Sequence, residues 1–311
     1  MKFDTRQQKS AAITGRGATL NPAPRFADHE KVMTAGSEGL LDALAPDTWL
    51  APEAARSILT KNQSPDIPFD RSINPYRGCE HGCVYCFARP SHAYADLSPG
   101  LDFETRIFYK ENAAALLADT LRRPGYQCRP VALGTNTDPY QPAERTLGIT
   151  RSLLETLSEY QHPVTIVTKG NLILRDLDLL ADMARRRLAS VMVSVTTLDA
   201  GLKRRLEPRT PSGQARLRVV RALADAGVPV GVMVAPVIPA INDAEIERIV
   251  DAAKSAGASR ARYILVRLPH EVKTLFRDWL EQHYPDRAGH VMSLIRQSRG
   301  GRDNDPRFGH R

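Results

Sequence analysis

Three cysteines on one short segment are the residues of this sequence best suited to chemistry. Cys79, Cys83 and Cys86 fall within eight positions with the spacing CxxxCxxC. Three thiolates on one tight loop can hold three irons of a cubane 4Fe-4S cluster, and the fourth iron then stays open to a chelating small molecule. Gly78 and Gly82 let the backbone fold closely around the sulfur atoms. The segment therefore favours an iron–sulfur site with one open coordination position.

Two other uses of these cysteines fit the sequence less well. A zinc site could combine the three thiolates with His81 or His92, but zinc knuckles and ribbons normally need a second CxxC pair, which this sequence lacks. A disulfide would leave one thiol over, and a reducing compartment disfavours it. Cys128 stands apart, just before a predicted strand and at the opposite end of that strand from the cluster. We expect a structural or surface thiol there.

Composition sets the class of protein. The 311 residues are 42% hydrophobic and 25% charged, which is ordinary for a soluble globular chain of one large domain or two small ones. No apolar run approaches the ~20 residues that span a bilayer, and the polar N-terminus lacks the apolar stretch of a secretory signal. We therefore expect a cytoplasmic protein that does not enter a membrane.

The positive charge of the chain bears on its partners. A net charge of +8 favours polyanions such as nucleic acid, although arginine-rich helices of many cytosolic enzymes give the same charge. The RG-rich segment 296–302 would suit a phosphate backbone, or it could be a solvated tail. Residues 16–26 and 299–308 share Arg-Gly, Asn, Pro and Arg-Phe at nearly equal spacing, which is either a coincidence or a paired contact surface.

Short apolar segments alternate with amphipathic ones along most of the chain. Strand followed by helix, repeated about six times, predicts right-handed crossovers and one parallel sheet. Periodicity alone does not decide between an open sheet and a barrel, but in both cases ligands collect at the carboxyl ends of the strands. The predicted strands are 71–77, 129–134, 163–168, 190–196, 228–235 and 261–267.

The chain divides into three parts on this basis. Residues 1–65 are expected to be an irregular N-terminal extension, because prolines interrupt it and only 36–45 and 52–60 have a helical pattern. Residues 66–285 form the α/β core. Residues 286–311 are expected to be a C-terminal helix and a basic tail.

The cysteine motif, with the aromatic Tyr85 before its last cysteine, resembles the signature of the radical S-adenosylmethionine (SAM) superfamily. Within it, residues 83–90 (CVYCFARP) resemble the branch related to spore photoproduct lyase. Further segments with this resemblance lie at or just past predicted strand ends: 168–170 (TKG), 194–197 (SVTT), 206–209 (LEPR) and 234–239 (VAPVIP).

The resemblance covers about residues 70–285 and implies a partial (β/α)6 barrel. It also implies a 4Fe-4S cluster whose open iron is chelated by the methionyl amine and carboxylate of SAM. A reductant such as flavodoxin or ferredoxin would supply the electron that breaks the bond between sulfur and the 5′ carbon. The 5′-deoxyadenosyl radical so formed would abstract hydrogen from a substrate.

Polar residues at the strand ends are the candidates for holding SAM. By resemblance, Thr137 and Asp138 lie where the methionyl end is held; an Asx or ST turn is the alternative. Lys169 could neutralise the carboxylate or reach the ribose, or be a solvated loop lysine. Ser194 and Thr196 point to one face of a strand, and the partner of their hydroxyls could be the ribose or a backbone carbonyl.

Aromatic residues beside the cluster form a second group of candidates. Tyr85 and Phe87 bracket the last cysteine and could contact adenine, or simply pack. Tyr76, Tyr94 and Tyr140 are expected near the mouth of the site, where they could stack on a base or relay hydrogen atoms.

One departure from the family pattern limits the assignment. In spore photoproduct lyase a hydrogen-donating cysteine follows the second strand, where this chain has Thr135, which argues against photoproduct repair. We predict a radical SAM enzyme, lyase-like or transferase-like, whose substrate is not encoded in any motif; nucleic acid is one candidate. The alternative is a non-catalytic iron–sulfur or zinc protein that binds nucleic acid.

Overall fold

The computed structural model of the protein describes residues 15–26, 47–62 and 69–304. The predicted helix 36–45 lies outside these ranges, and the division of the chain after residues 65 and 285 stays a prediction. None of the helices in the described ranges has the length and apolar character needed to cross a lipid bilayer.

A sheet of seven strands forms the centre of the fold, in the order β10-β9-β8-β7-β6-β3-β2. Six of these strands are parallel, and β2 joins the edge antiparallel to β3. The parallel strands overlap the six predicted segments, although β8 begins one residue earlier and β9 ends two residues later, so the predicted α/β fold with a partial barrel of parallel strands is confirmed. Their bounds are β3 (Arg71–Ile73), β6 (Val131–Leu133), β7 (Val164–Thr168), β8 (Ala189–Ser194), β9 (Val230–Val237) and β10 (Ala261–Leu265).

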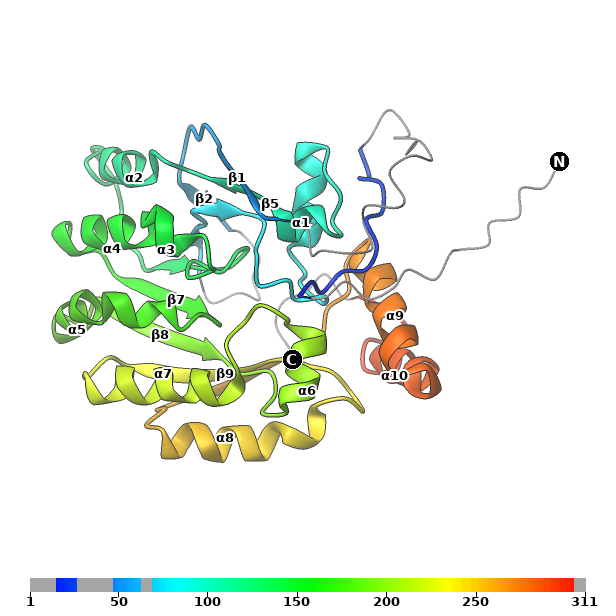
Figure 1. The fold of residues 1–311 in the computed structure, drawn as a ribbon. Helices are drawn as coiled ribbons and strands as arrows, with labels where there is room; N and C mark the ends of the chain where they lie inside the picture. Colours follow the sequence, from blue (N-terminus) through cyan, green and yellow to red (C-terminus); the bar gives the residue numbers. More distant parts are fainter. Residues whose placement is uncertain (1–14, 27–46, 63–68, 305–311) are drawn as a thin grey trace.

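Helices follow the strands along the outer face of this sheet (Figure 1). They include α4 (Ile149–Glu159), α5 (Leu177–Arg185), α7 (Gly213–Asp225) and α8 (Ile246–Ser255). Val193 and Val232 point to this face and pack in one core with Val220 and Ile249 of the helices. Burying each such side chain stabilises the fold by about 1.5–3 kcal/mol. The opposite, inner face carries smaller and more polar side chains.

A second, three-stranded sheet has the order β1-β5-β4 and was not predicted. It contains β1 (Trp49–Pro52), β5 (Arg106–Tyr109) and β4 (Tyr76–Arg77). The predicted strand 71–77 is therefore divided between the two sheets, on either side of Asn74 and Pro75. The predicted helical stretch 52–60 is wrong: no helix forms there, and β2 (Leu59–Lys61) pairs with β3. Pairing with strands distant in the sequence overrides a weak helical propensity.

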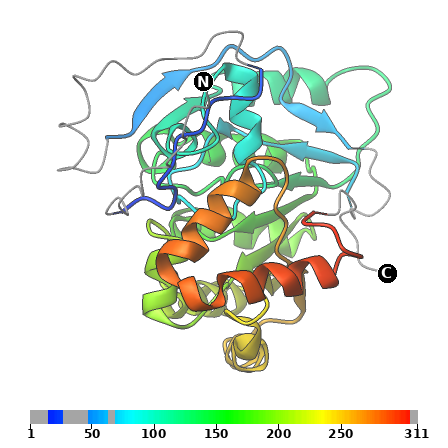
Figure 2. The same ribbon diagram turned by 90° about the vertical axis from the view of Figure 1, so that its right-hand side faces the viewer.

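Two helices near the C-terminal end, α9 (Val272–His283) and α10 (Pro285–Gln297), lie side by side at the carboxyl ends of the strands (Figure 2). Phe276 and Trp279 of α9 form an apolar cluster with Leu206, Val84 and Tyr85. The remaining helices are shorter: α1 (Asp102–Thr105), α2 (Ala113–Leu121), α3 (Glu144–Leu147) and α6 (Ala200–Leu206), with the 3-10 turns η1 (Arg89–Ala95), η2 (Leu172–Asp176) and η3 (Asp243–Glu245).

The RG-rich segment 296–302 contributes to this packing. The Arg299 guanidinium donates hydrogen bonds to the carbonyls of Leu265 and Val266, at 3.1 and 2.6 Å. Arg296 pairs with Asp303 at 3.5 Å. At these two arginines the expectation of a free phosphate-binding tail is wrong, because their charges are used within the fold.

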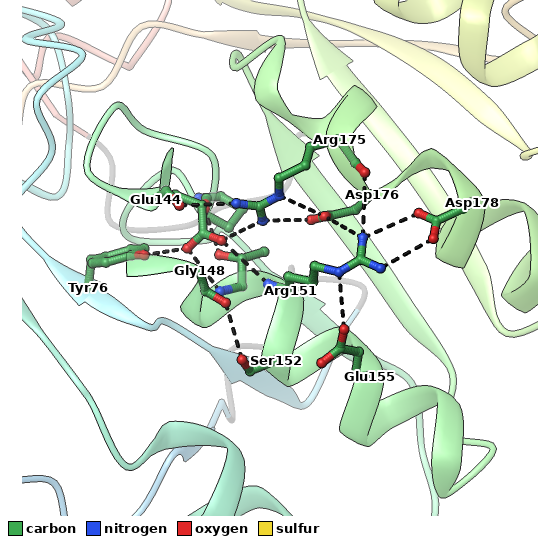
Figure 3. Close-up of polar contacts among 11 residues, drawn as sticks. Tyr76, Glu144, Gly148, Arg151, Ser152, Glu155, Arg175, Asp176 and Asp178 are labelled. Carbon is green, nitrogen blue, oxygen red and sulfur yellow. Dashed lines mark hydrogen bonds and ion pairs between the residues drawn. The ribbon is translucent and has the colours of Figure 1, made fainter. Parts of the chain in front are cut away.

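A buried carboxylate fixes the strand that leads into the cysteine segment (Figure 3). The Tyr76 hydroxyl donates to Glu144, which also accepts hydrogen bonds from Arg175 at 2.7 Å and from the Thr150 amide at 2.9 Å. Burial, together with the Glu144 charge, raises the pKa of Tyr76, so the hydroxyl keeps its proton. Tyr76 and Tyr140 are each 2% exposed, so the predicted placement of these two tyrosines at an open mouth is wrong.

Replacing Glu144 by Ala should destabilise the fold strongly. The change removes the acceptor shared by Tyr76 and Arg175, and breaking a buried pair costs about 3 kcal/mol or more. Glu155→Ala is the matched control, because Glu155 is exposed and contacts the same network only through Arg151; its loss should cost less than about 1 kcal/mol. Urea unfolding followed by circular dichroism compares the two, and equal midpoints would contradict the role given to Glu144.

Candidate active site

The cysteine segment, residues 78–86, follows β4 directly and has no helix or strand of its own. Its backbone is held by loops from three other parts of the fold. The Cys79 amide donates to the Phe103 carbonyl at 2.9 Å, and the Val84 amide donates to the Leu206 carbonyl at 3.1 Å. Gln141 accepts from the Glu80 amide and donates to the Gly78 carbonyl. The conformation of the segment is thus fixed from several sides.

The three thiols are enclosed together at this point. Cys79 and Cys83 are buried and Cys86 is half-buried. Burial raises the pKa of all three thiols, that of Cys83 to about 12, and the neighbouring cysteines add to the effect on Cys79. Backbone amides oppose it: those of Ala88 and Arg89 favour the Cys86 thiolate, and that of Asp138 favours the Cys79 thiolate.

This donor set fits an iron–sulfur cluster. Three thiolates in one enclosed space need cationic partners, and amide hydrogen bonds to sulfur are a usual outer shell of such clusters. Among the residues that the structure describes, no three His, Cys, Asp or Glu side chains are placed to hold one metal ion together. In a cubane each thiolate binds a different iron, so such convergence is not needed.

The two histidines considered as zinc ligands make other contacts. His92 Nε2 lies 2.9 Å from the Arg106 carbonyl oxygen, and burial lowers the pKa of His92 to about 4. His81 Nδ1 lies 3.3 Å from Asp138 Oδ2. Each ring therefore has a protein partner of its own.

Asp138 links the cysteine segment to the end of β7. Besides His81, its carboxylate accepts hydrogen bonds from the Thr168 hydroxyl at 2.6 Å and the Lys169 amide at 2.7 Å. Burial alone would raise the pKa of Asp138, but His81, the amide and the hydroxyl together lower it to about 2. The Thr137 hydroxyl donates to the Tyr76 carbonyl at 3.2 Å. Both side chains are engaged within the protein, and contact of either with SAM stays a prediction.

A second buried carboxylate, Glu207, lies under Tyr85. It accepts from the Tyr85 hydroxyl, from Thr196 Oγ1 at 2.6 Å and from Arg216, which is 1% exposed. Burial opposes ionisation, yet the Arg216 charge and these hydrogen bonds lower the pKa of Glu207 to about 2. Thr196 thus has a carboxylate as partner.

Glu207 and Arg209 do not pair with each other. Arg209 reaches Glu80 of the cysteine segment at 3.2 Å instead. The segment LEPR therefore contacts the cysteine segment through the Leu206 carbonyl to Val84, through Glu207 to Tyr85 and through Arg209 to Glu80.

Lys169 and Ser194 are the predicted residues whose polar atoms stay available. Lys169 Nζ lies 5.8 Å from the centre of the Tyr85 ring, and its charge lowers the pKa of Cys83 against the larger effect of burial. Within the described part of the chain, neither Lys169 Nζ nor the Ser194 hydroxyl makes a hydrogen bond, although Ser194 is only 3% exposed. Phe87 is 38% exposed, and its contact with adenine stays a prediction.

The N-terminal segment 15–26 contributes residues that sequence reasoning missed. It runs along the carboxyl ends of the strands, in dark blue in Figures 1 and 2. The Gly17 and Ala18 amides donate to the Glu104 carboxylate at 3.0 and 2.8 Å, and Arg89 binds the same carboxylate at 2.5 Å. Arg89 also donates to the Cys83 carbonyl at 2.9 Å. One buried ion pair therefore joins this segment to the cysteine segment.

The contact between the two segments is close. A Cβ atom on Gly17 would lie 1.7 Å from the Gly82 carbonyl oxygen, so only glycine fits there. The sequence offered one sign of this contact, the Arg-Gly pair at residues 16 and 17. The same pair begins the similar segment 299–308 near the C-terminus.

Comparison with known proteins decides the family. The sequence model of the Radical SAM superfamily matches residues 73–253, which is more than half of the chain. The protein belongs to the radical SAM superfamily. The match runs from the last residue of β3 into α8, and it includes the cysteine segment and the carboxyl ends of β6, β7, β8 and β9.

Individual proteins are also similar in sequence to this radical SAM protein. An uncharacterized protein of Mycobacterium tuberculosis is 40% identical over 233 residues, which cover 74% of this chain and 68% of the relative. An uncharacterized protein of Methanocaldococcus jannaschii is 27% identical over 216 residues, 69% of this chain and 76% of the relative.

Solved structures share the fold. Spore photoproduct lyase in a complex with AdoMet and dinucleoside spore photoproduct matches with a TM-score of 0.53 and 18% identity. The match covers 76% of this chain and 66% of that one, so this radical SAM protein spans slightly less than two thirds of the length of the lyase. The fold predicted from the cysteine motif is thus confirmed, while the activity of the lyase does not follow from a likeness at this identity.

A substitution at Gly17 tests whether the N-terminal segment holds the cysteine segment of this radical SAM protein in place. Gly17→Ala should force the two segments apart, and overpacking of this kind costs about 1–3 kcal/mol. We expect reconstituted protein to lose iron faster to a chelator under anaerobic conditions. Gly289→Ala, where no atom lies within 4 Å of the added Cβ, is the control. Equal rates of iron loss in the two variants would show that the N-terminal segment does not hold the cysteine segment.

Proposed function

We propose that this chain is a radical SAM enzyme that binds a 4Fe-4S cluster through Cys79, Cys83 and Cys86. The observation that carries the proposal is the enclosure of these three thiols, with backbone amides directed at them, in a chain of the radical SAM superfamily. Cys128 takes no part, because it is exposed and precedes β6, at the opposite end of that strand from the cysteine segment.

SAM binds beside the cluster against the ends of β7 and β8. Lys169 directs its ammonium group, which has no hydrogen-bond partner among the described residues, toward Tyr85 and Cys83, where it neutralises the SAM carboxylate. Ser194 supplies a hydroxyl one strand away for the ribose. When bound, the cluster and SAM supply reductive cleavage to methionine and a 5′-deoxyadenosyl radical.

The residues of the chain orient the cofactor and keep water out. Glu207 holds the Tyr85 ring under Lys169, and Asp138 fixes the backbone of Lys169 itself. Apolar side chains of α9 pack in one cluster with Tyr85. A reductant of the flavodoxin or ferredoxin class delivers the electron.

The radical acts on a substrate other than spore photoproduct. Thr135 stands where the lyase pattern has its hydrogen-donating cysteine, and its hydroxyl contacts the Asn74 side chain at 3.3 Å. The charge of +8 and the likeness to a structure that holds a dinucleoside spore photoproduct support nucleic acid or its components as substrate.

Anaerobic reconstitution with iron and sulfide tests the cluster. Wild-type protein should bind about four irons and, after reduction with SAM present, form 5′-deoxyadenosine. Cys83→Ala should lose both properties, whereas Cys128→Ala should keep them. A single bound zinc without 5′-deoxyadenosine would instead support a non-catalytic nucleic-acid-binding protein.

The role of Lys169 can be tested separately. Lys169→Met keeps the length of the side chain but removes its charge, and a hydrogen bond to a charged group contributes about 1.5–3 kcal/mol. We therefore expect the dissociation constant for SAM, measured by equilibrium dialysis and normalised to iron content, to rise by about tenfold or more. Lys254→Met, on the exposed face of α8, is the control. Equal affinity in the two variants would remove Lys169 from the site.

A further inference from the structure

Strand register places an arginine in line with the proposed SAM site. Ser194 of β8 pairs with Met233 of β9, and Met233 pairs with Arg262 of β10. Residues paired across neighbouring strands point to the same side of a sheet. Val232 and Val234 point the other way, into the core under the helices. Arg262 therefore lies on the inner face, two strands from Ser194 and about 10 Å away at the usual strand spacing.

A second arginine lies on the same face because β9 carries a glycine there. Arg260 precedes Arg262 by two positions, so the two side chains share a side of the strand. A Cβ atom on Gly231 would lie 2.5 Å from Arg260 Cγ and 2.7 Å from Met192 Sδ. The stem of Arg260 thus occupies the space above Gly231, and any side chain at position 231 would displace it.

Both guanidinium groups are available to a ligand. Arg260 and Arg262 are exposed, and within the described ranges neither guanidinium group makes an ion pair or a hydrogen bond. Buried arginines such as Arg89 and Arg216 are, in contrast, fully engaged with carboxylates.

The surrounding inner face has no negative charge to neutralise them. The Thr165 and Ser190 hydroxyls meet on this face at 3.2 Å. No acidic side chain occurs among the inner-facing residues of β7, β8 and β10 or of β9 as far as Ala235; they are Thr165, Val167, Ser190, Met192, Ser194, Gly231, Met233, Ala235, Arg262 and Ile264.

We propose that Arg260 and Arg262 bind a phosphate group of the substrate, and that the substrate is a nucleotide, free or within a strand. Guanidinium groups match the geometry of phosphate oxygens and bind them through paired hydrogen bonds. The phosphate lies over β10 while the rest of the substrate reaches toward the SAM site over β8. The inference deepens the proposed function and rests on it for the position of SAM.

Binding to reconstituted protein with SAM present tests the phosphate site. The probe is a fluorescein-labelled single strand of about ten thymidine nucleotides, followed by anisotropy at several salt concentrations. In the double variant Arg260→Gln/Arg262→Gln the dissociation constant should rise by about tenfold or more. The slope of log K against log salt should fall by about 0.7 to 1.4, for one or two lost phosphate contacts. Arg218→Gln, on the exposed side of α7, should bind as the wild type does.

A single variant and competition identify what is bound. Arg262→Gln alone changes an exposed side chain, so its weaker binding cannot arise from misfolding of the packed stem of Arg260. Competition by thymidine 5′-monophosphate supports a free nucleotide, and competition by an unlabelled strand alone supports a polynucleotide. Equal competition by thymidine, which has no phosphate, would overturn the proposal, as would wild-type affinity in the double variant.

The same samples separate this inference from the proposed function. Wild-type protein that binds the strand through these arginines but forms no 5′-deoxyadenosine would contradict radical chemistry and support the phosphate site. Wild-type protein that forms 5′-deoxyadenosine, while the double variant binds the strand as tightly, would support radical chemistry and overturn the phosphate site.

Discussion

Buried ion pairs between glutamate and arginine hold the cysteine segment, and the rest of the site depends on them. The segment has neither a helical nor a sheet pattern of hydrogen bonds, so its polar backbone groups need partners from elsewhere. Arg89, paired with Glu104, binds the Cys83 carbonyl from one side. Glu207, paired with Arg216, binds the Tyr85 hydroxyl from another. Glu144, paired with Arg175, holds Tyr76 at the entry to the segment (Figure 3).

Such ion pairs contribute little to the stability of the fold, but they fix the positions of the groups that they bind. Taking two charges out of water costs several kcal/mol, which their attraction only roughly offsets. A carboxylate that accepts hydrogen bonds from three or four donors, however, fixes all of those donors relative to one another. Glu104 does so for three donors. The Gly17 and Ala18 amides are 87 and 86 residues away from it in the sequence, and Arg89 is 15 residues away. Rigid placement of the sulfur atoms follows from these carboxylates.

The sequence predicted those parts of the fold that depend on local pattern. The strand 190–196 was found because β-branched residues follow one another between a helix and a turn, and β8 occupies Ala189–Ser194. The cysteine segment was found because its ligands lie within eight positions. β1 and β5 were missed, since they stabilise each other across more than fifty residues and neither has a distinctive pattern alone.

The same reasoning explains why the candidate site was only partly predicted. Lys169 and Ser194 stand at the ends of predicted strands, so the general rule for parallel sheets brings them together. Glu104 and Arg216 could not be assigned from sequence, because a charged residue on a helix looks exposed until its partner is known. Arg216 lies on α7 among apolar residues, and its burial is explained by the Glu207 carboxylate together with the carbonyls of Ser194 and Pro211.

The two faces of the parallel sheet differ in composition and in role. Valines on the outer face pack against helices and stabilise the fold, whereas the inner face carries hydroxyl groups, a glycine and two exposed arginines. Arg262 lies exposed on the edge strand β10 and buries little apolar surface. An apolar residue at this position would bury more surface and so stabilise the fold more. The position of Arg262 in one row with Ser194 and Met233 instead agrees with the proposal that a substrate lies over this part of the inner face.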